Sequence, residues 1–460
     1  MLRFTTLLLL AFLAFPACRQ ADPASPPPVQ APALRPPEPD WFKNANIYEV
    51  NIRQYTPEGT FAAFEAHLPR LRDLGVDVLW LMPIHPISEA KRKGSLGSPY
   101  ANADYTAVNP GYGTMEDFKR LVSKAHELGM KLILDWVPNH TGWDHVWIAQ
   151  HPDWYTRDPG TDSIIHPAGT DWTDVADLNY GSREMRKAMG DAMLFWLREA
   201  DIDGFRCDVS GFVPDDFWAE LRPRLDSVKT VFMLSENGDN AAHFASCFNA
   251  NYGWPLKDVM LGILNGAGAD TLSDYLAGIA RDFPSHACHM SFITNHDENT
   301  WNKLPMRFGA GEDAYAVLAF TLDGMPLIYS GQESGLQKQL SFFDKDQIDW
   351  GTFAKTGFYR TLLDLKHRNE ALWNGIHGGR AVTIPQTEPD AVFAYYREQR
   401  GDRVVAAVNL SGQPRKITLQ GSGYSGTYRE CFRQTEQQLA PGTVLELEPW
   451  GYRVYASEQP

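Results

Sequence analysis

Three carboxylates that follow short apolar runs constrain the fold of this chain more than any other feature. Asp208 and Glu236 come directly after such runs, and Asp297 follows a third run after Asn295 and His296. The carboxyl ends of parallel strands in a closed barrel all meet at one face, so strands of this kind would bring the three carboxylates together. The pattern therefore predicts a parallel barrel with a site at the ends of its strands.

The earlier part of the chain alternates strand and helix at a regular interval. Apolar strands are expected at 47–52, 76–82 and 131–137, and helices with apolar residues at helical spacing are expected at 60–74 and 115–128. A glycine follows each of these helices, as it commonly does at a helix end. Strand, helix and glycine in this repeated order are typical of βα units around a parallel sheet.

The spacing of the later segments completes a set of eight strands. A barrel has about 30 residues per βα unit, so the interval from Glu236 to Asp297 holds one further strand, expected near 248–252. The run 325–330 supplies the eighth strand, and a helix at 359–368 closes the barrel. The predicted fold class is α/β, a (β/α)8 TIM barrel with an insertion after strand 3 and a C-terminal antiparallel β-sandwich domain.

Changes in composition divide the chain into four parts. Residues 1–18 are predicted to be a signal peptide, because their apolar run is too short to span a bilayer, and the Pro-rich residues 19–40 form a linker. The catalytic barrel occupies 41–374, with an insertion at 141–180 that is rich in Trp, Asp, Pro and Gly. Short alternating strands divided by turn residues make 375–460 the β-sandwich domain.

The cysteines bear on where the protein resides. A small residue precedes Cys18 at the end of the signal segment, which resembles a bacterial lipoprotein signal whose cysteine carries the lipid. Lipid anchoring and plain secretion both stay open, and either one predicts an exported protein that is periplasmic, outer-membrane-anchored or extracellular. The four later cysteines lack the paired spacing of a disulfide framework or a zinc site, so free buried thiols are expected, with one bridge left open.

Composition excludes some classes of partner. A net charge of −15 argues against nucleic acid, which is bound by basic surfaces. A hydrophobic content of 43% with 22% charged residues is typical of a globular protein and not of a disordered one. An uncharged substrate would be indifferent to this balance, so the acidity names no partner by itself.

Two carboxylates at neighbouring strand ends are what glycoside hydrolysis requires. Arg206 lies two residues before Asp208, on the same face of a strand, and is expected to favour the charged form of Asp208, which suits a nucleophile. Glu236 follows an apolar run, and a drier site raises its pKa, which suits a general acid. Each carboxylate alone could equally be an ordinary ion-pair partner; three of them beside His or Arg favour a site.

Six motifs in chain order resemble those of the alpha-amylase family, glycoside hydrolase family thirteen. They are Asp-Trp-Val-Pro-Asn-His at 135–140, Asp-Leu-Asn at 177–179, Gly-Phe-Arg-Cys-Asp at 204–208, Glu236, Asn-His-Asp at 295–297, and 324–333. The resemblance runs from about Trp41 to the C-terminus. It implies an enzyme that acts on an α-1,4-glucan of starch type or on a maltooligosaccharide, and whose chemistry requires no cofactor.

The resemblance also implies a retaining double displacement with a role for each residue. Asp208 would form the covalent glycosyl-enzyme, Glu236 would act as acid and then as base, and Asp297 would hold the 2- and 3-hydroxyls of the sugar. The substrate-binding residues it implies are Tyr100, which would stack under that sugar, His140 and His296, which would contact it, and Arg206, which would orient the nucleophile.

The sequence departs from many α-amylases directly after the nucleophile. Gly211 and Phe212 stand where those enzymes have Lys-His, of which the histidine carbonyl binds a structural calcium and the lysine lines an acceptor subsite. Asn139 is retained as a candidate calcium ligand, so a structural calcium is a prediction that rests on this one side chain. The only partners that the sequence predicts are the glucan or maltooligosaccharide substrate and a membrane lipid anchor.

Other functions share the same motifs. A glucanotransferase, or an oligosaccharide-specific α-glucosidase or α-1,6-glucosidase, differs only in the bond that is cut and in what reaches the intermediate. A non-catalytic sugar-binding protein on the same barrel is disfavoured, because such relatives have typically lost a catalytic carboxylate. The insertion tryptophans either wall the cleft or form the core of the insertion, and the core is the preferred interpretation; they are Trp143, Trp147, Trp154 and Trp172.

Overall fold

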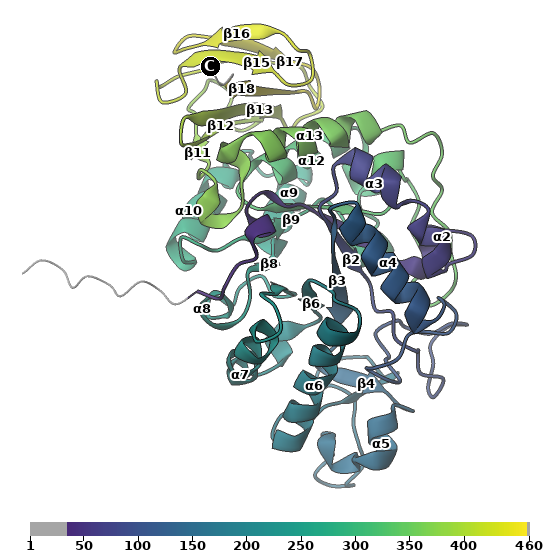
Figure 1. Ribbon diagram of the computed structural model, residues 1–460. Coiled ribbons are helices and arrows are strands. Elements are labelled where there is room, and N and C mark those ends of the chain that lie inside the picture. Colours follow the sequence, from purple (N-terminus) through teal and green to yellow (C-terminus); the bar gives the residue numbers. More distant parts are fainter. Residues whose placement is uncertain (1–34, 458–460) are drawn as a thin grey trace, which may run out of the picture. The chain divides into compact units, whose positions relative to one another are not determined.

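Eight parallel strands close into a barrel in the computed structural model, which describes residues 35–457 (Figure 1). The order around the barrel is β1-β10-β9-β8-β7-β6-β3-β2. These strands are β1 Ile47–Val50, β2 Val78–Leu81, β3 Lys131–Trp136, β6 Gly204–Cys207, β7 Phe232–Ser235, β8 Ala250–Tyr252, β9 His289–Ser291 and β10 Met325–Tyr329. The predicted barrel fold is confirmed, whereas the predicted signal peptide and most of the linker lie outside the described residues.

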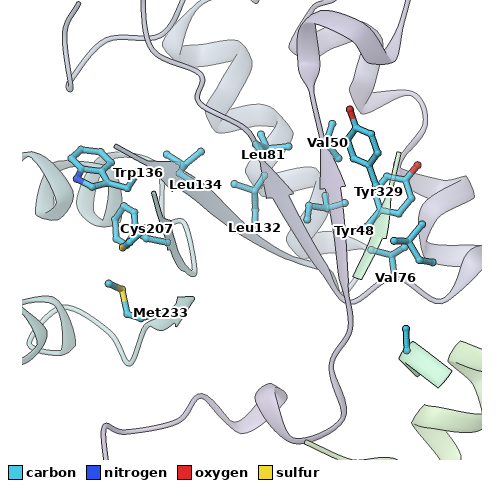
Figure 2. Packing of buried hydrophobic residues seen from close by; sticks show 14 of the residues in the cluster. Tyr48, Val50, Val76, Leu81, Leu132, Leu134, Trp136, Cys207, Met233 and Tyr329 are labelled. Atoms are coloured by element: carbon cyan, nitrogen blue, oxygen red, sulfur yellow. The ribbon is translucent and has the colours of Figure 1, made fainter. Parts of the chain in front are cut away.

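Alternation along each strand separates two apolar layers. Leu132, Leu134 and Trp136 of β3 pack in the layer that also contains the apolar faces of the surrounding helices (Figure 2). Ile133 points the other way and joins the cluster inside the barrel. Successive side chains of a strand point to opposite faces, so Asp135 shares the inner face with Ile133 and reaches the mouth of the barrel.

The longer helices cover the outside of the barrel, and several short helices lie in the loops between its strands. They are α1 Ile52–Tyr55, α2 Phe61–Glu65, α3 Leu68–Leu74, α4 Met115–Glu127, α5 Val146–Gln150, α6 Arg183–Glu199, α7 Asp215–Asp226, α8 His243–Ser246, α9 Trp254–Leu264, α10 Thr271–Asp282, α11 His296–Asn302, α12 Glu312–Thr321 and α13 Thr356–Arg368. No helix within 35–457 combines the length and apolar character of a membrane span. Within the same residues the four cysteines are buried and none is in a disulfide.

Two sequence-based predictions of local structure were wrong. The helix expected at 60–74 is divided into α2 and α3, because Pro69 lies in the first turn of α3, where a missing N–H is tolerated but an uninterrupted helix is not. The strand expected at 291–294 ends at Ser291. Beyond it the side chain of Asn295 caps α11, so Asp297 lies in the first turn of a helix and not at a strand end.

Gly204 determines how closely β6 approaches β7. Its φ is +156°, and a Cβ at this position would lie 1.9 Å from the carbonyl oxygen of Phe232 in β7. The two strands pair in parallel with Cys207 opposite Ser235. The next residues, Asp208 and Glu236, therefore leave the barrel at the same level from neighbouring strands.

The insertion and the C-terminal region are antiparallel. In the insertion β4 His140–Gly142 pairs with β5 Val175–Asp177. The C-terminal region has a six-stranded sheet, β11-β12-β13-β18-β15-β16, and a two-stranded sheet, β14-β17, whose apolar side chains share one cluster, as predicted for a sandwich. Its strands are β11 Val382–Thr383, β12 Val392–Gln399, β13 Asp402–Asn409, β14 Arg415–Thr418, β15 Gly426–Glu430, β16 Glu436–Leu439, β17 Val444–Leu447 and β18 Tyr452–Ser457.

Candidate active site

The structure brings the three predicted carboxylates into one cleft. Asp208 follows β6, Glu236 follows β7 and Asp297 lies in α11, and all three line a cavity of about 570 Å³ at the mouth of the barrel. Tyr100, His140 and His296 line the same cavity, whereas Arg206 lies beneath it. The sequence thus identified residues that the fold places side by side.

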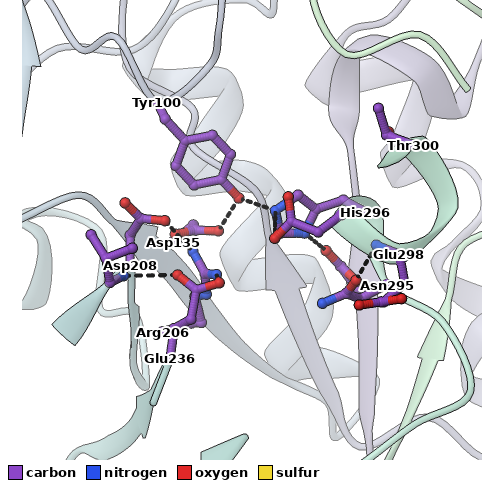
Figure 3. Close-up of polar contacts among 12 residues, drawn as sticks. Tyr100, Asp135, Arg206, Asp208, Glu236, Asn295, His296, Glu298 and Thr300 are labelled. Atoms are coloured by element: carbon purple, nitrogen blue, oxygen red, sulfur yellow. Dashed lines mark hydrogen bonds and ion pairs between the residues drawn. The ribbon is translucent and has the colours of Figure 1, made fainter. Parts of the chain in front are cut away.

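Arg206 is the cation around which the carboxylates are arranged (Figure 3). Its Nη1 lies 2.8 Å from Oδ1 of Asp135 and 3.0 Å from Oδ1 of Asp208, and its Nη2 lies 2.7 Å from Oε1 of Glu236. Its Nε donates to the hydroxyl of Tyr252 at 2.9 Å. Burial lowers the pKa of Arg206, but Asp135 and Glu236 outweigh burial and raise it, so this side chain stays charged.

Asp208 and Glu236 retain a proton more strongly than exposed carboxylates do. Burial, followed by the charge of Glu236, raises the pKa of Asp208 well above its ordinary value, and burial raises the pKa of Glu236 although Arg206 opposes it. Arg206 does favour the charged form of Asp208, as predicted, but burial and the charge of Glu236 outweigh it in the net pKa of Asp208. The two carboxylates lie close enough for the charge of Glu236 to raise the pKa of Asp208, as in other carboxylate pairs.

Val209 joins the two carboxylates through its backbone. Its N–H donates to Oε2 of Glu236 at 2.8 Å, directly after Asp208 in the chain. Its φ is +34°, in the left-handed region that a β-branched residue rarely adopts. Strain of this kind collects at functional sites, where the surrounding structure holds it, and here it aims an N–H at the second carboxylate.

A charged histidine holds the other side of the cleft. Nδ1 of His296 lies 2.5 Å from Oε1 of Glu49, and its Nε2 lies 2.8 Å from the hydroxyl of Tyr100 and 3.4 Å from Oδ2 of Asp297. Burial opposes the charge, but Asp297 and Glu49 outweigh burial and raise the pKa of His296 to about 9. His296 is therefore an imidazolium at neutral pH, and both of its ring nitrogens donate.

Tyr100 and His140 complete the walls around this centre. The hydroxyl of Tyr100 donates to Oδ2 of Asp135 at 3.0 Å, and its ring stacks on Phe342 with the ring centroids 5.9 Å apart. His140 lies beside Trp172, with centroids 5.5 Å apart, and burial lowers the pKa of His140 to about 3, so this ring is neutral. A charged and a neutral imidazole thus face the same cavity.

Comparison with known proteins identifies the family. Residues 39–374 match the family model for the alpha-amylase catalytic domain. The chain belongs to the alpha-amylase family. A second model, for the C-terminal domain of maltogenic amylase, matches residues 382–454. The resemblance inferred from the six motifs is confirmed, and the chain is an enzyme of the glycoside hydrolase and transferase class.

Several members of the family are similar over most of this chain. Alpha-amylase 3 of Dictyoglomus thermophilum is 28% identical over 421 residues, which cover 83% of this chain and 81% of that protein. The alpha-1,4-glucan:maltose-1-phosphate maltosyltransferase of Rhodospirillum rubrum is 34% identical over 411 residues, covering 79% of this chain and 56% of the longer protein. The crystal structure of an alpha-amylase from Lactobacillus plantarum superposes with a TM-score of 0.79 at 31% identity, covering 90% and 99% of the two chains.

This alpha-amylase-family chain has two site residues that the sequence reasoning did not assign, Glu49 and Asp135. Glu49 is buried in β1 and neutralises His296, and Asp135 is buried in β3 and accepts from Arg206, Tyr100 and Trp80. The available signal was a carboxylate inside an otherwise apolar strand, since a buried charge is retained only beside a partner. Asp135 is separated from its partner Arg206 by 71 residues of sequence, and Glu49 is separated from its partner His296 by 247. Patterns along the chain therefore could not identify these partners.

The departure from the family pattern after the nucleophile has a structural basis. Gly211 packs so closely that a Cβ there would lie 2.5 Å from Nδ2 of Asn237, so a lysine would displace that amide. Phe212 is 57% exposed, and its ring stacks on Trp172 with centroids 6.1 Å apart and planes inclined by 23°. The rim of the cleft beside Glu236 is therefore aromatic where many α-amylases carry Lys-His.

The tryptophans of the insertion divide between core and cleft. Trp147 and Trp154 pack edge to face with centroids 5.1 Å apart, as the core interpretation predicts. Trp172 lines the cavity with Asp208 and Glu236, so the core interpretation was wrong for this residue. Trp143 is partly buried and packs against the core, and its Nε1 donates to the carbonyl of Thr173 at 3.0 Å.

The residues around Asn139 do not fit a calcium ion. Calcium takes about six to eight oxygen ligands, with carboxylates prominent among them. Nδ2 of Asn139 faces Nδ1 of His140 at 3.3 Å, and nowhere in the described part of the chain do three His, Cys, Asp or Glu side chains converge as metal ligands.

Proposed function

We propose that this protein is a retaining glycosidase that cleaves α-1,4-glucosidic bonds in starch-type α-glucans or maltooligosaccharides. The observation that carries the proposal is the arrangement of Asp208 and Glu236 on two nitrogens of one buried guanidinium, with Asp297 and His296 facing them across the cavity. Two carboxylates held this closely leave no room for a water on the far side of the sugar, and this favours retention over inversion.

The reaction proceeds in two displacements. A carboxylate oxygen of Asp208 bonds to the anomeric carbon while the bond from that carbon to the glycosidic oxygen breaks, and Glu236 gives its proton to the departing oxygen. Water then gives a proton to Glu236 and bonds to the anomeric carbon, and the ester to Asp208 breaks. Burial raises the pKa of Glu236, which helps it to hold the proton that it gives to the departing oxygen in the first displacement.

The remaining polar groups hold the sugar on the glycone side. Asp297 accepts from the 2- and 3-hydroxyls, and these bonds tighten as the ring flattens towards the oxocarbenium ion. The imidazolium of His296 lies beside the same hydroxyls and beside Tyr100, whose ring offers an apolar face for the pyranose. Arg206 stays charged throughout and stabilises whichever carboxylate is ionised.

Transfer to a second sugar is the alternative that an observation favours. Trp172 and the exposed Phe212 offer stacked aromatic rings beside Glu236, where a leaving sugar or an incoming acceptor would bind. A sugar held there competes with water for the glycosyl-enzyme. The maltosyltransferase similar to this chain is named for such a reaction.

Product analysis tests these proposals in one series. Starch, pullulan and maltooligosaccharides are incubated with the enzyme, products are separated by chromatography, and the anomeric configuration of the first product is read by NMR. Retained α-configuration with shorter maltooligosaccharides supports the proposal. Products longer than the substrate identify transfer, and maltotriose released from pullulan identifies cleavage of its α-1,6 bonds. Initial release of the β-anomer, or no cleavage of any glucan, would refute retaining hydrolysis.

We further propose that the protein is exported, as the N-terminal segment and Cys18 predict from the sequence. Metabolic labelling with palmitate tests the lipid anchor: a lipoprotein incorporates label, and Cys18→Ser loses both the label and membrane association. Absence of label on an exported protein leaves secretion as the route. A structural calcium, which the sequence left open at Asn139, is tested by chelation below.

A further inference from the structure

The two catalytic carboxylates orient the cleft. Glu236 protonates the leaving oxygen, so the leaving sugars lie on its side, and the glycone extends the opposite way, past Tyr100 towards Phe342 and Phe343. This orientation rests on the proposed function. On the leaving side the residues after Glu236 are the short Asn237 and Gly238, whereas the glycone side is crossed by a chain of contacts.

The first link joins the loop after β2 to the insertion. Nζ of Lys93 lies 2.9 Å from Oδ1 of the buried Asp174 and donates to the carbonyl of Asp171 at 3.1 Å. All three residues line the cavity, so the ion pair forms part of its wall. Asp144 of the insertion holds the same loop independently, because its Oδ2 accepts from the N–H of Glu89 at 2.8 Å.

The second link joins this loop to the segment after β10. Oδ1 of Asp344 accepts from the N–H and the hydroxyl of Ser95 at 2.8 and 2.6 Å, and the N–H of Leu96 donates to the carbonyl of Phe343 at 3.0 Å. The buried Arg53 clamps both segments from below, with Nη1 on the carbonyl of Gly97 at 3.1 Å and Nη2 on the carbonyl of Phe342 at 2.6 Å.

The third link carries the wall on to α11. Trp301, which is 54% exposed, packs on Phe342 and Phe343 with ring centroids 5.4 and 6.1 Å away. Insertion, β2 loop, β10 loop and α11 thus form a continuous rim on the glycone side. We call this rim the glycone wall and define it by Asp174, Lys93, Ser95, Phe343 and Trp301.

We propose that the glycone wall makes the cleft blind beyond the first sugars, so that the enzyme takes glucan chains by their non-reducing ends. The cavity that this wall borders has a volume of about 570 Å³, which lies in the size range of sites that bind a single small ligand. The substrates are therefore maltooligosaccharides and polymer ends, and each cleavage releases a short product of about one or two glucose units. Interior bonds of a long chain are not cut, because the chain would have to pass through the wall.

A pair of maltoheptaosides tests this proposal. Both carry 4-nitrophenyl at the reducing end, and one carries in addition a 4,6-ethylidene group on the non-reducing end. The wild type is expected to cut the free substrate with glucose or maltose as the first unlabelled product, and to cut the blocked substrate about tenfold more slowly or worse. Equal rates on the two substrates, or long first products, would overturn the proposal. Failure to cut either substrate would instead refute the hydrolase assignment.

Opening the wall is the second arm of the test. Lys93→Ala removes the link to Asp174, while Asp144 and Asp344 still hold the loop, so the fold is retained. The discrimination between free and blocked substrate is expected to fall to about threefold or less. Lys416→Ala is the matched control, because Lys416 forms an exposed pair with Glu446 in the C-terminal region, and it should leave the discrimination unchanged. Unchanged discrimination in Lys93→Ala, with a normal melting curve, would remove Lys93 from the wall.

Discussion

Replacing Asp208 by Asn is expected to abolish turnover and at the same time to stabilise the protein at neutral pH. The pKa of Asp208 lies well above its ordinary value because burial and the charge of Glu236 outweigh Arg206. The ionised side chain therefore costs folding free energy, and a neutral amide of the same size removes that cost. A gain of about 1–3 kcal/mol is expected, which is within the range found when buried charged groups are replaced by neutral ones of similar size.

Asp135→Asn is the matched control, because burial raises the pKa of Asp135 as well, but the two oxygens of Asp135 accept from three donors whose loss outweighs the removal of the charge. Oδ1 of Asp135 accepts from Arg206 at 2.8 Å, and Oδ2 accepts from Tyr100 at 3.0 Å and from Trp80 at 3.1 Å. An amide presents N–H to one of these donors in either orientation. Each buried donor left unsatisfied costs about 1–3 kcal/mol, so a loss of about 2–4 kcal/mol is expected.

Denaturant unfolding at two pH values measures both variants. A carboxyl whose folded pKa is raised contributes stability that is present below its unfolded pKa of about 3.9 and is lost as pH rises through the folded value. The advantage of Asp208→Asn should therefore be larger at about pH 7 than at about pH 5. Turnover of a 4-nitrophenyl maltooligosaccharide should fall by about 10⁴-fold. A variant that is less stable than wild type at neutral pH, or that retains turnover, would refute the reasoning.

Three further results are expected. Phe212→Ala should raise KM for maltooligosaccharides by about three- to tenfold, while a melting curve stays unchanged because the ring is largely exposed; an unchanged KM would remove Phe212 from substrate binding. Glu49→Gln takes away a charge that raises the pKa of His296 to about 9, so the alkaline decline of kcat/KM should begin at lower pH, and a superimposable pH profile would contradict this. A calcium chelator should leave the melting temperature unchanged, since the residues around Asn139 do not fit calcium; a fall of several degrees would show a site.

The parts of the site that were predicted from sequence are those whose signal is local. Asp208 and Glu236 directly follow strands of four residues, and the β6–β7 register places them side by side without further information. Asp297 lines the cavity with the other two carboxylates but was assigned to the wrong element. The strand ends at Ser291, three residues before the apolar run ends, and Asn295 caps a helix. The spacing of apolar residues, from which the strand was predicted, does not indicate where a helix cap lies.

The parts that could not be predicted depend on contacts between distant segments. The raised pKa of Asp208 follows from its burial and from the charge of Glu236 on the neighbouring strand, and the opposing charge of Arg206 is shared with Asp135 of a third strand. The glycone wall depends on Lys93 meeting Asp174 and on Ser95 meeting Asp344, across 81 and 249 residues of sequence respectively. No pattern in the loop itself indicates which segments it joins.

Gly204 shows how a missing side chain can set a chemical distance. A methyl group at this position would collide with the carbonyl of Phe232 and force β6 away from β7. Asp208 would then recede from Glu236, and the two oxygens that must act on one glycosidic bond would no longer reach it together. The constraint on this position is thus one of catalytic reach as much as of folding, and it acts four residues before the nucleophile. A substitution at Gly204 should therefore lower turnover even where the barrel still folds.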